Sequence, residues 1–188
     1  GNAQLSAEQI VSYDLGYEFP LSKRVEAKAN LFYNAMDKLI ETKLTGFTYN
    51  YLNNGERNTK GVETELEFLI TEHLKGFINH TIQDMYDEAK GGNYRGAPKN
   101  KVNSGLRFTS DKGLTANITV HYVDSYELEQ GKINSYVLGN ARIGYMFPHK
   151  DLEAALSVYN LFHDVHREYP VGGDEIGTLA IVSINYKF

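Results

Sequence analysis

The stretch IVSYDLGYEF, residues 10–19, decides the fold, because its side chains alternate strictly between apolar and polar. A period of two places the two sets on opposite faces of an extended strand. A strand in a soluble protein usually has about five or six residues. A tilted strand that crosses a bilayer needs about nine to eleven, which is the length found here.

The same alternation recurs through the rest of the chain, where seven further stretches show it: 25–36, 61–68, 102–108, 114–123, 137–147, 152–162 and 177–188. Residues 76–87 have a noisier pattern and are predicted as one more strand. The sequence therefore predicts an all-β fold of about nine antiparallel strands.

The predicted connections alternate in length. Short turns are expected at Pro20–Lys23, Glu72–Lys75, Asp111–Gly113 and Pro148–Asp151. Long polar loops are expected at about 41–59, 88–100, 125–134 and 163–176. Outer-membrane barrels have short periplasmic turns and long extracellular loops, whereas a soluble sandwich has no reason to separate its loops in this way.

The composition of the 188 residues excludes several classes of protein. A net charge of −5 argues against nucleic-acid binding, and the absence of cysteine excludes disulfide scaffolds and cysteine metal sites. No apolar run approaches the roughly 18 residues of a transmembrane helix. We find no Ser/His/Asp constellation, phosphate loop or zinc signature, so we predict no enzyme, no catalytic residue and no cofactor.

Alternation fits both a soluble β-protein with an apolar core and a barrel whose apolar face meets lipid. Three features favour lipid: a heavily charged polar face that includes Glu63, Glu65 and Glu67, aromatic residues at strand ends, and an aromatic C-terminus. Such rings form girdles at the headgroup level. The predicted girdle residues are Tyr17, Phe19, Phe68, Phe108, Tyr145, Phe147, Tyr186 and Phe188.

Polar side chains of the opposite parity are expected to face water or a plug. They are Asp14, Glu18, Glu26, Lys28, Glu63, Glu65, Glu67, Arg107, Arg142 and Lys187.

Five segments, in order along the chain, resemble the TonB-dependent receptors of bacterial outer membranes. They are LSAEQIVSYDLGYEF (5–19), ANLFYNAMDKLI (29–40), NTKGVETELEF (58–68), APKNKVNSGLRF (97–108) and LSVYNLFHDVHREYPVGGDEIG (156–177). The usual N-L-F-D core of the last segment departs from the family pattern here, because His163 stands between Phe162 and Asp164. The final strand also resembles the general outer-membrane assembly signal.

The resemblance implies import of a ferric siderophore, haem, cobalamin or an oligosaccharide across the bacterial outer membrane. It also implies contact with lipid and a 22-stranded barrel, preceded by a plug domain and a segment that contacts TonB. We therefore expect residues 1–188 to be a C-terminal barrel segment without the plug and earlier strands. The chain begins at Gly1, with neither Met nor a signal peptide.

Nine strands cannot close alone in the bacterial pattern of even strand numbers, and open edges are not viable in lipid. A fragment, a barrel completed by another chain and a refolded soluble fragment are all consistent with this count. Two other hypotheses remain open. One is a small self-contained outer-membrane barrel with a structural or adhesive role, and the other is a soluble β-sheet binding module.

Candidate ligand residues lie in the predicted loops. Phe47, Tyr49 and Tyr51 could stack on an incoming ligand, or pack on one another at a hairpin tip. Arg95, with nearby lysines, could attract an anionic siderophore or simply be solvated. His163 and His166 could approach a metal, although such pairs are usually plain surface residues.

Overall fold

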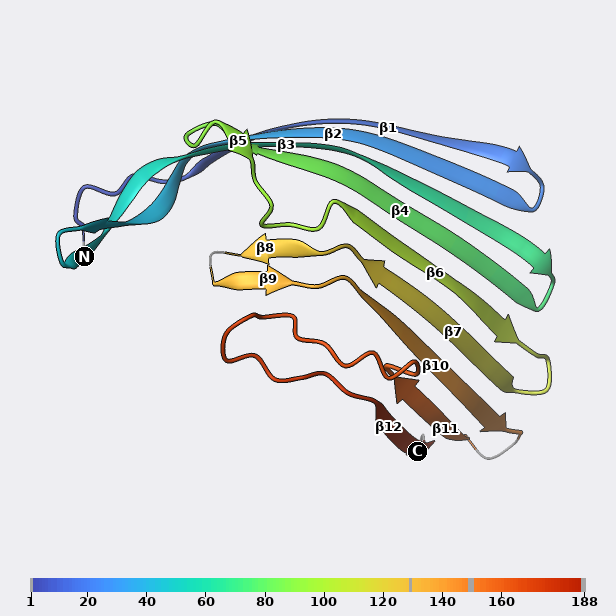
Figure 1. The fold of residues 1–188 in the computed structure, drawn as a ribbon. Coiled ribbons are helices and arrows are strands. Elements are labelled where there is room, and N and C mark those ends of the chain that lie inside the picture. The colour runs from blue at the N-terminus through green and yellow to red at the C-terminus, as the bar shows by residue number, and fades with distance from the viewer. Residues whose placement is uncertain (1, 129, 149–150, 187–188) are drawn as a thin grey trace.

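The computed structural model describes residues 2–128, 130–148 and 151–186, and every regular element in them is a β-strand (Figure 1). The long strands are β1 (Gln9–Ser22), β2 (Val25–Thr45), β3 (Thr48–Thr71), β4 (Leu74–Asp87), β6 (Asn100–Thr109), β7 (Leu114–Val123), β10 (Tyr136–Phe147), β11 (Leu152–Tyr159) and β12 (Leu179–Tyr186). Among these residues, no helix is long and apolar enough to cross a bilayer.

These nine strands form one antiparallel sheet in the order β1-β2-β3-β4-β6-β7-β10-β11-β12. Each strand pairs with its neighbours along the chain, so the sheet is a continuous meander (Figure 1). The described strands β1 and β12 do not pair with each other, and the sheet is therefore not closed. The predicted all-β fold of about nine antiparallel strands, as part of a barrel, is confirmed.

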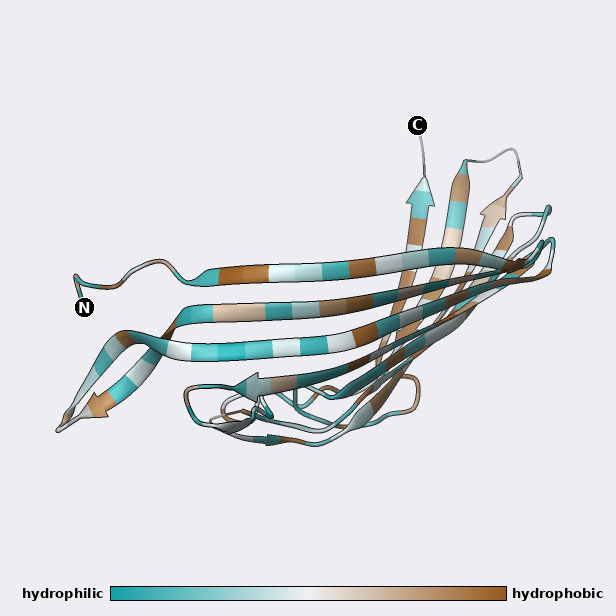
Figure 2. Cartoon of the chain, turned by 90° about the horizontal axis from the view of Figure 1, so that it is seen from above, coloured by the Kyte–Doolittle hydropathy of each residue, from teal (hydrophilic) through white to brown (hydrophobic). Residues whose placement is uncertain are grey.

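The register of the sheet joins the alternating patterns into two continuous faces. Leu31 of β2 lies opposite Leu15 of β1 and Val62 of β3, and Val62 lies opposite Ile82 of β4. Figure 2 shows the resulting alternation of hydrophobic and hydrophilic residues along the strands. A slip of one residue in any pair would move a whole apolar set to the wrong face.

The apolar face is open rather than packed. Leu15 is 69% exposed and Val182 is 75% exposed, and many large hydrophobic side chains are similarly accessible. Among the described residues, the buried hydrophobic side chains are Ala27, Ile133, Tyr136 and Ala155. A soluble β-module would bury its apolar stripes against each other, and this sheet does not.

The polar face also contains phenylalanines, and each of them lies against a glycine of the next strand. A Cβ atom added to Gly61 would lie 2.4 Å from Cζ of Phe32, and one added to Gly105 would lie 2.7 Å from Cε1 of Phe77. A ring that covers a glycine restores packing that the missing side chain would leave open. These pairs explain why aromatic residues interrupt an otherwise polar wall.

Three predicted loops contain regular structure. The prediction of a loop at 41–59 is wrong, because β2 and β3 continue through it as a long hairpin that turns at Gly46 and Phe47. The 88–100 segment contains β5 (Gly92–Asn93), which pairs with β4. The 125–134 segment contains the hairpin of β8 (Tyr126–Leu128) and β9 (Gly131–Ile133).

Candidate functional site

The inner, polar face of β1, β2 and β3 gathers a lysine among glutamates. Nζ of Lys28 lies 3.3 Å from Glu26, 3.5 Å from Glu65 and 3.7 Å from Glu18, measured to the nearest carboxylate oxygen. The register produces this cluster, because it sets Lys28 opposite Glu18 on one side and Glu65 on the other. A hollow of about 580 Å³ covers it, lined also by Glu63.

The charges of this wall do not balance. Lys28 pairs with Glu18, Glu26 and Glu65, while in the described chain Glu63 and Glu67 on the same face form no ion pair. Two amide oxygens of the wall, Oδ1 of Asn79 and Oδ1 of Asn103, are buried without a hydrogen-bond donor. The wall therefore presents acceptors and negative charge in excess.

The other half of the wall is better compensated. The Arg142 guanidinium of β10 contacts Glu153 of β11 at 2.5 Å, and Nδ2 of Asn185 donates to the same carboxylate at 3.3 Å. These three residues come from three successive strands, so the register alone brings them together. The excess of acceptors is thus concentrated near β1–β6.

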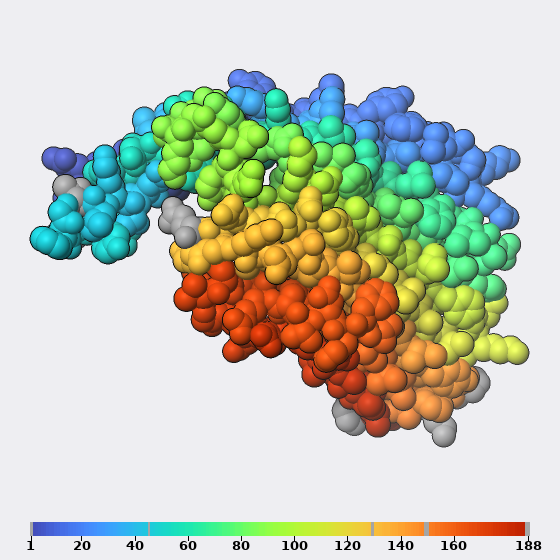
Figure 3. Space-filling view, in the orientation of Figure 1, coloured from blue at the N-terminus to red at the C-terminus, as the bar shows by residue number. Residues whose placement is uncertain are grey.

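The connections after β4, β7 and β11 lie at the end of the sheet opposite the short turns (Figure 1). In Figure 3 their side chains cover that end of the sheet. The connections after β4 and β7 line a hollow of about 350 Å³ that includes Tyr94, Arg95, Tyr126 and Lys132. The carbonyl oxygen of Arg95 accepts a hydrogen bond from N of Glu127 at 2.7 Å, which fixes one loop to the next. Burial, with a smaller contribution from the Glu168 charge, raises the pKa of Tyr126 above its ordinary value.

His166 lies in a second hollow of about 540 Å³, which also includes Lys132. Its ring stacks on Tyr136 at 4.1 Å between centroids, and its Nδ1 lies 2.7 Å from the carbonyl oxygen of Asp164. His163 is exposed, and its Nδ1 lies 3.0 Å from Oγ1 of Thr178. The two imidazoles have different partners, and in the described part of the chain no three His, Cys, Asp or Glu side chains form a group suited to a metal.

Phe47, Tyr49 and Tyr51 lie at and near the tip of the β2–β3 hairpin, where all three are exposed. They are not packed on one another as a closed tip would be, and they do not line the hollows around Arg95 and His166. The structure thus separates the predicted ligand residues into two places, the hairpin tip and the loop hollows.

The sequence does not predict a hydrogen-bond network that the structure shows in the final loop. Asn160 is 2% exposed and has a left-handed backbone, with φ of 49°. Its Nδ2 donates to the carbonyl oxygens of Asp164 and Ile176, and its Oδ1 accepts from N of Asp164. The Asp164 carboxylate in turn accepts from N of Val137 on β10. The sequence signal was the N-L-F-D resemblance, whose extra His163 the chain accommodates with φ of 54°.

The predicted girdle aromatics occupy the rim beside the short turns. Their partners across the sheet are strand-end residues: Phe19 faces Ala27, Phe68 faces Val25, Phe108 faces Leu74, Tyr145 faces Leu114, Phe147 faces Leu152 and Tyr186 faces Leu152. Tyr17 stacks on Phe19 at 5.5 Å, and Tyr145 meets Phe147 edge-on at 5.0 Å. Phe188 and Lys187 lie outside the described residues. Contact between this rim and a membrane stays a prediction.

Known proteins share this architecture. Three solved structures that it resembles are the copper transporter OprC, the ferric yersiniabactin uptake receptor FyuA from Yersinia pestis, and the FrpB iron transporter from Neisseria meningitidis. Their TM-scores are 0.81, 0.72 and 0.76, at 12%, 19% and 14% sequence identity. The alignments cover 99%, 95% and 98% of this chain but 32%, 28% and 32% of those proteins, so the chain spans about a third of their length.

The family model described as "TonB dependent receptor-like, beta-barrel" matches residues 1–161, which is most of the chain. That match agrees with the open meander, the exposed apolar face and the polar inner wall. The chain therefore belongs to the β-barrel family of TonB-dependent receptors.

Proposed function

We propose that this chain forms the C-terminal part of the barrel wall of a receptor that imports a scarce nutrient across the bacterial outer membrane. The observation that carries the proposal is the division of one sheet into an exposed apolar face and an acidic, acceptor-rich inner face. Exposed apolar surface of this extent needs a cover, and a band of rings along one rim suits the lipid interface.

The remainder of the receptor is the partner proposed for the inner face and for the two free edges. Earlier strands would pair with β1 and β12, because unpaired backbone groups are costly in lipid. A plug with cationic and amide donors would complement Glu63, Glu67, Asn79 and Asn103. Contact with TonB would be made by the plug side of the receptor, outside these residues.

The cargo proposed is a small anionic molecule such as a ferric siderophore. The loop hollow beside Arg95 and Lys132 offers two cations and tyrosine rings. The structures that the chain resembles include one named for ferric yersiniabactin and one named for copper, and this range leaves the particular cargo to experiment.

Orientation in the membrane is tested by arginine substitution at two neighbouring positions of β2 in the whole receptor. Leu31→Arg places a charge on the apolar face midway along the β1–β2 pairing, and such a change at mid-membrane depth in a barrel costs about 2–4 kcal/mol. Asn30→Arg places the same charge on the inner face opposite Glu63. We expect Leu31→Arg to lose heat-stable, membrane-inserted receptor and Asn30→Arg to retain it. Equal insertion of the two variants would contradict the proposed lipid face.

Transport is tested by deleting the receptor gene and measuring uptake of labelled ferric siderophores, haem, cobalamin and oligosaccharides, with and without TonB. We expect uptake of one of these classes to require both the receptor and TonB. Unchanged uptake of all four would refute import of these cargoes. A ten-stranded protein encoded by an intact gene would instead favour a small self-contained barrel with a structural or adhesive role.

A further inference from the structure

The β2–β3 hairpin extends beyond the sheet as a two-stranded ribbon. Pairing between β1 and β2 ends at Gln9 and Asp37, and pairing between β3 and β4 ends at Arg57 and Asp87. Beyond these points the strand pairing of residues 38–56 is within the ribbon, which projects about 25 Å at the usual rise of a strand. The N-terminal segment also bonds to the ribbon, because Nδ2 of Asn2 donates to the carbonyl oxygen of Tyr51 and N of Ser6 donates to Oδ1 of Asn53. In Figure 1 the ribbon twists away from the rest of the sheet. Its turn is formed by Gly46 and Phe47, between the paired residues Thr45 and Thr48.

The base of the ribbon is a bulge. The β2–β3 register shifts between Met36 and Leu39 and again between Leu39 and Ile40, and Lys38 has φ of 56°. A Cβ atom on Gly55 would lie 2.8 Å from Cβ of Leu39, so glycine permits this close crossing of the strands. Bulges bend a strand and increase its twist.

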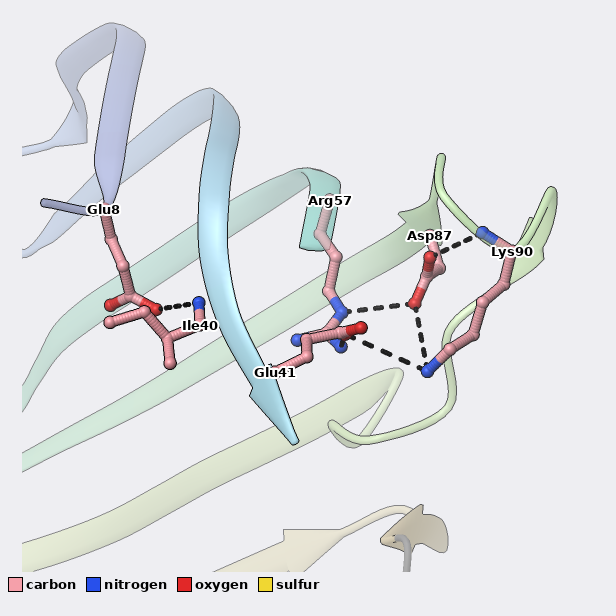
Figure 4. Close-up of polar contacts among 6 residues, drawn as sticks. All are labelled: Glu8, Ile40, Glu41, Arg57, Asp87 and Lys90. Carbon is pink, nitrogen blue, oxygen red and sulfur yellow. Dashed lines mark hydrogen bonds and ion pairs between the residues drawn. The ribbon is translucent and has the colours of Figure 1, made fainter. Parts of the chain in front are cut away.

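Side chains satisfy the backbone groups that the bulge takes out of the strand ladder. N of Ile40 donates to the Glu8 carboxylate at 2.7 Å, as Figure 4 shows. Nδ2 of Asn53 donates to the carbonyl oxygen of Lys38, also at 2.7 Å. The joint thus depends on side-chain contacts more than the regular sheet below it does.

A cluster of ionic side chains lies across this joint (Figure 4). The Arg57 guanidinium contacts Glu41 of the ribbon and lies 3.3 Å from the carboxylate of Asp87, whose side chain is 3% exposed. Lys90 joins the cluster, because its Nζ lies 3.8 Å from Asp87 and its backbone N donates to the same carboxylate. The Arg57 guanidinium also stacks on the Tyr94 ring, 4.2 Å from its centroid.

We propose that Arg57 is a latch that fixes the angle of the ribbon at its bulge and joins the ribbon to the 88–99 loop. Glu41 belongs to the ribbon, Asp87 ends β4, and Lys90 and Tyr94 belong to the loop, so one guanidinium connects three parts of the molecule. Removing Arg57 leaves the two carboxylates with Lys90 alone, whose exposed Nζ lies 3.9 Å from Glu41 and 3.8 Å from Asp87. Two largely buried carboxylates then share one distant cation, which weakens the connection between the ribbon and the loop. Tyr94 also lines the loop hollow, so the latch is in contact with that site.

The latch is tested in the whole receptor, reconstituted in lipid nanodiscs, by electron–electron distance measurements. Spin labels are attached at Thr48→Cys, beside the ribbon tip, and at Ser135→Cys, immediately before β10. These 188 residues contain no native cysteine, so labelling within them is selective. We expect one narrow distance distribution in the otherwise unsubstituted receptor, and a distribution roughly twofold wider, or split, in Arg57→Ala because the joint becomes a free hinge.

Glu41→Gln is the second variant, and it carries the test if Arg57→Ala does not assemble. It keeps the contact between Arg57 and Asp87 but weakens the ribbon's side of the latch, so we expect a smaller broadening. Arg142→Ala is the matched control, because it breaks an arginine–glutamate contact between neighbouring strands elsewhere in the sheet. The proposal is overturned by an unchanged distribution in the latch variants, by equal broadening in the control, or by a broad distribution before substitution.

Discussion

Asn160 is predicted to hold the final loop, residues 163–178, against the sheet. Its side chain makes three hydrogen bonds, at 2.9, 3.0 and 3.2 Å, and replacing it with alanine removes all three. At about 1 kcal/mol for each bond, the loss is about 3 kcal/mol. Alanine also tolerates the left-handed backbone poorly, which adds about 1 kcal/mol. The total of about 4 kcal/mol corresponds to roughly a thousandfold change in the local opening equilibrium.

Hydrogen exchange of the whole receptor is the suitable assay, because it measures local opening and does not require the barrel to unfold in one step. We expect the protected amides of the final loop, such as N of Ile176, to lose about three orders of magnitude of protection in Asn160→Ala. Asn160→Gly loses the same hydrogen bonds but relieves the backbone, so its protection should be about fivefold higher than that of the alanine variant.

Asn50→Ala, on the exposed part of the hairpin, is the matched control and should leave the final loop unchanged. If protection in Asn160→Ala stays within about threefold of that in the parent receptor, other contacts hold the loop, and the role assigned to the Asn160 hydrogen bonds is wrong. Equal protection in the glycine and alanine variants would show that backbone strain at position 160 contributes nothing, and that the loss comes from the hydrogen bonds alone.

Two further predictions concern the wall and a loop base. Gly61→Val should destabilise the barrel by about 1–3 kcal/mol, because a Cβ there meets both the Phe32 ring and a backbone carbonyl. Gly16→Val should be tolerated, since its nearest neighbour would lie 3.5 Å away, and heat-stability of the inserted receptor compares the two. Asp124 accepts a hydrogen bond from Asn100 at 2.9 Å, which holds the pKa of its carboxyl below the ordinary 3.8. The ionised carboxylate therefore stabilises the folded loop above pH 3.8, and this stabilisation is lost as the pH falls through the lowered pKa. The protection of the amides near residues 124–126, measured relative to their intrinsic exchange at each pH, should therefore fall in acid. Asp124→Asn should abolish that pH dependence, and a parent loop whose protection does not change in acid would contradict the assignment.

Some features were predictable because they depend on near neighbours in the chain. The alternation in residues 10–19 and 114–123 sets both the extended conformation and the two faces, since successive side chains of a strand point in opposite directions. Residues 76–87 looked noisier because Phe77 lies on the polar face, where it covers Gly105, a reason that a single strand does not reveal.

The sequence predicts a loop at 41–59 because the bulge near Lys38 breaks the period of two there. A bulge inserts a residue and shifts the parity of everything beyond it. The strand residues past this bulge are also mostly polar, so neither their period nor their composition distinguishes them from a loop. The long hairpin was recognisable only from the pairing of its two strands.

The sequence alone determined that this chain forms long amphipathic strands, because period and strand length are local properties. Only the tertiary structure decided which charges meet, as with Lys28 among its glutamates and Arg57 between Glu41 and Asp87. Partners of this kind lie on different strands, and their meeting depends on register and loop packing. Both arise from the backbone hydrogen bonds of the whole sheet, which no short stretch of sequence contains.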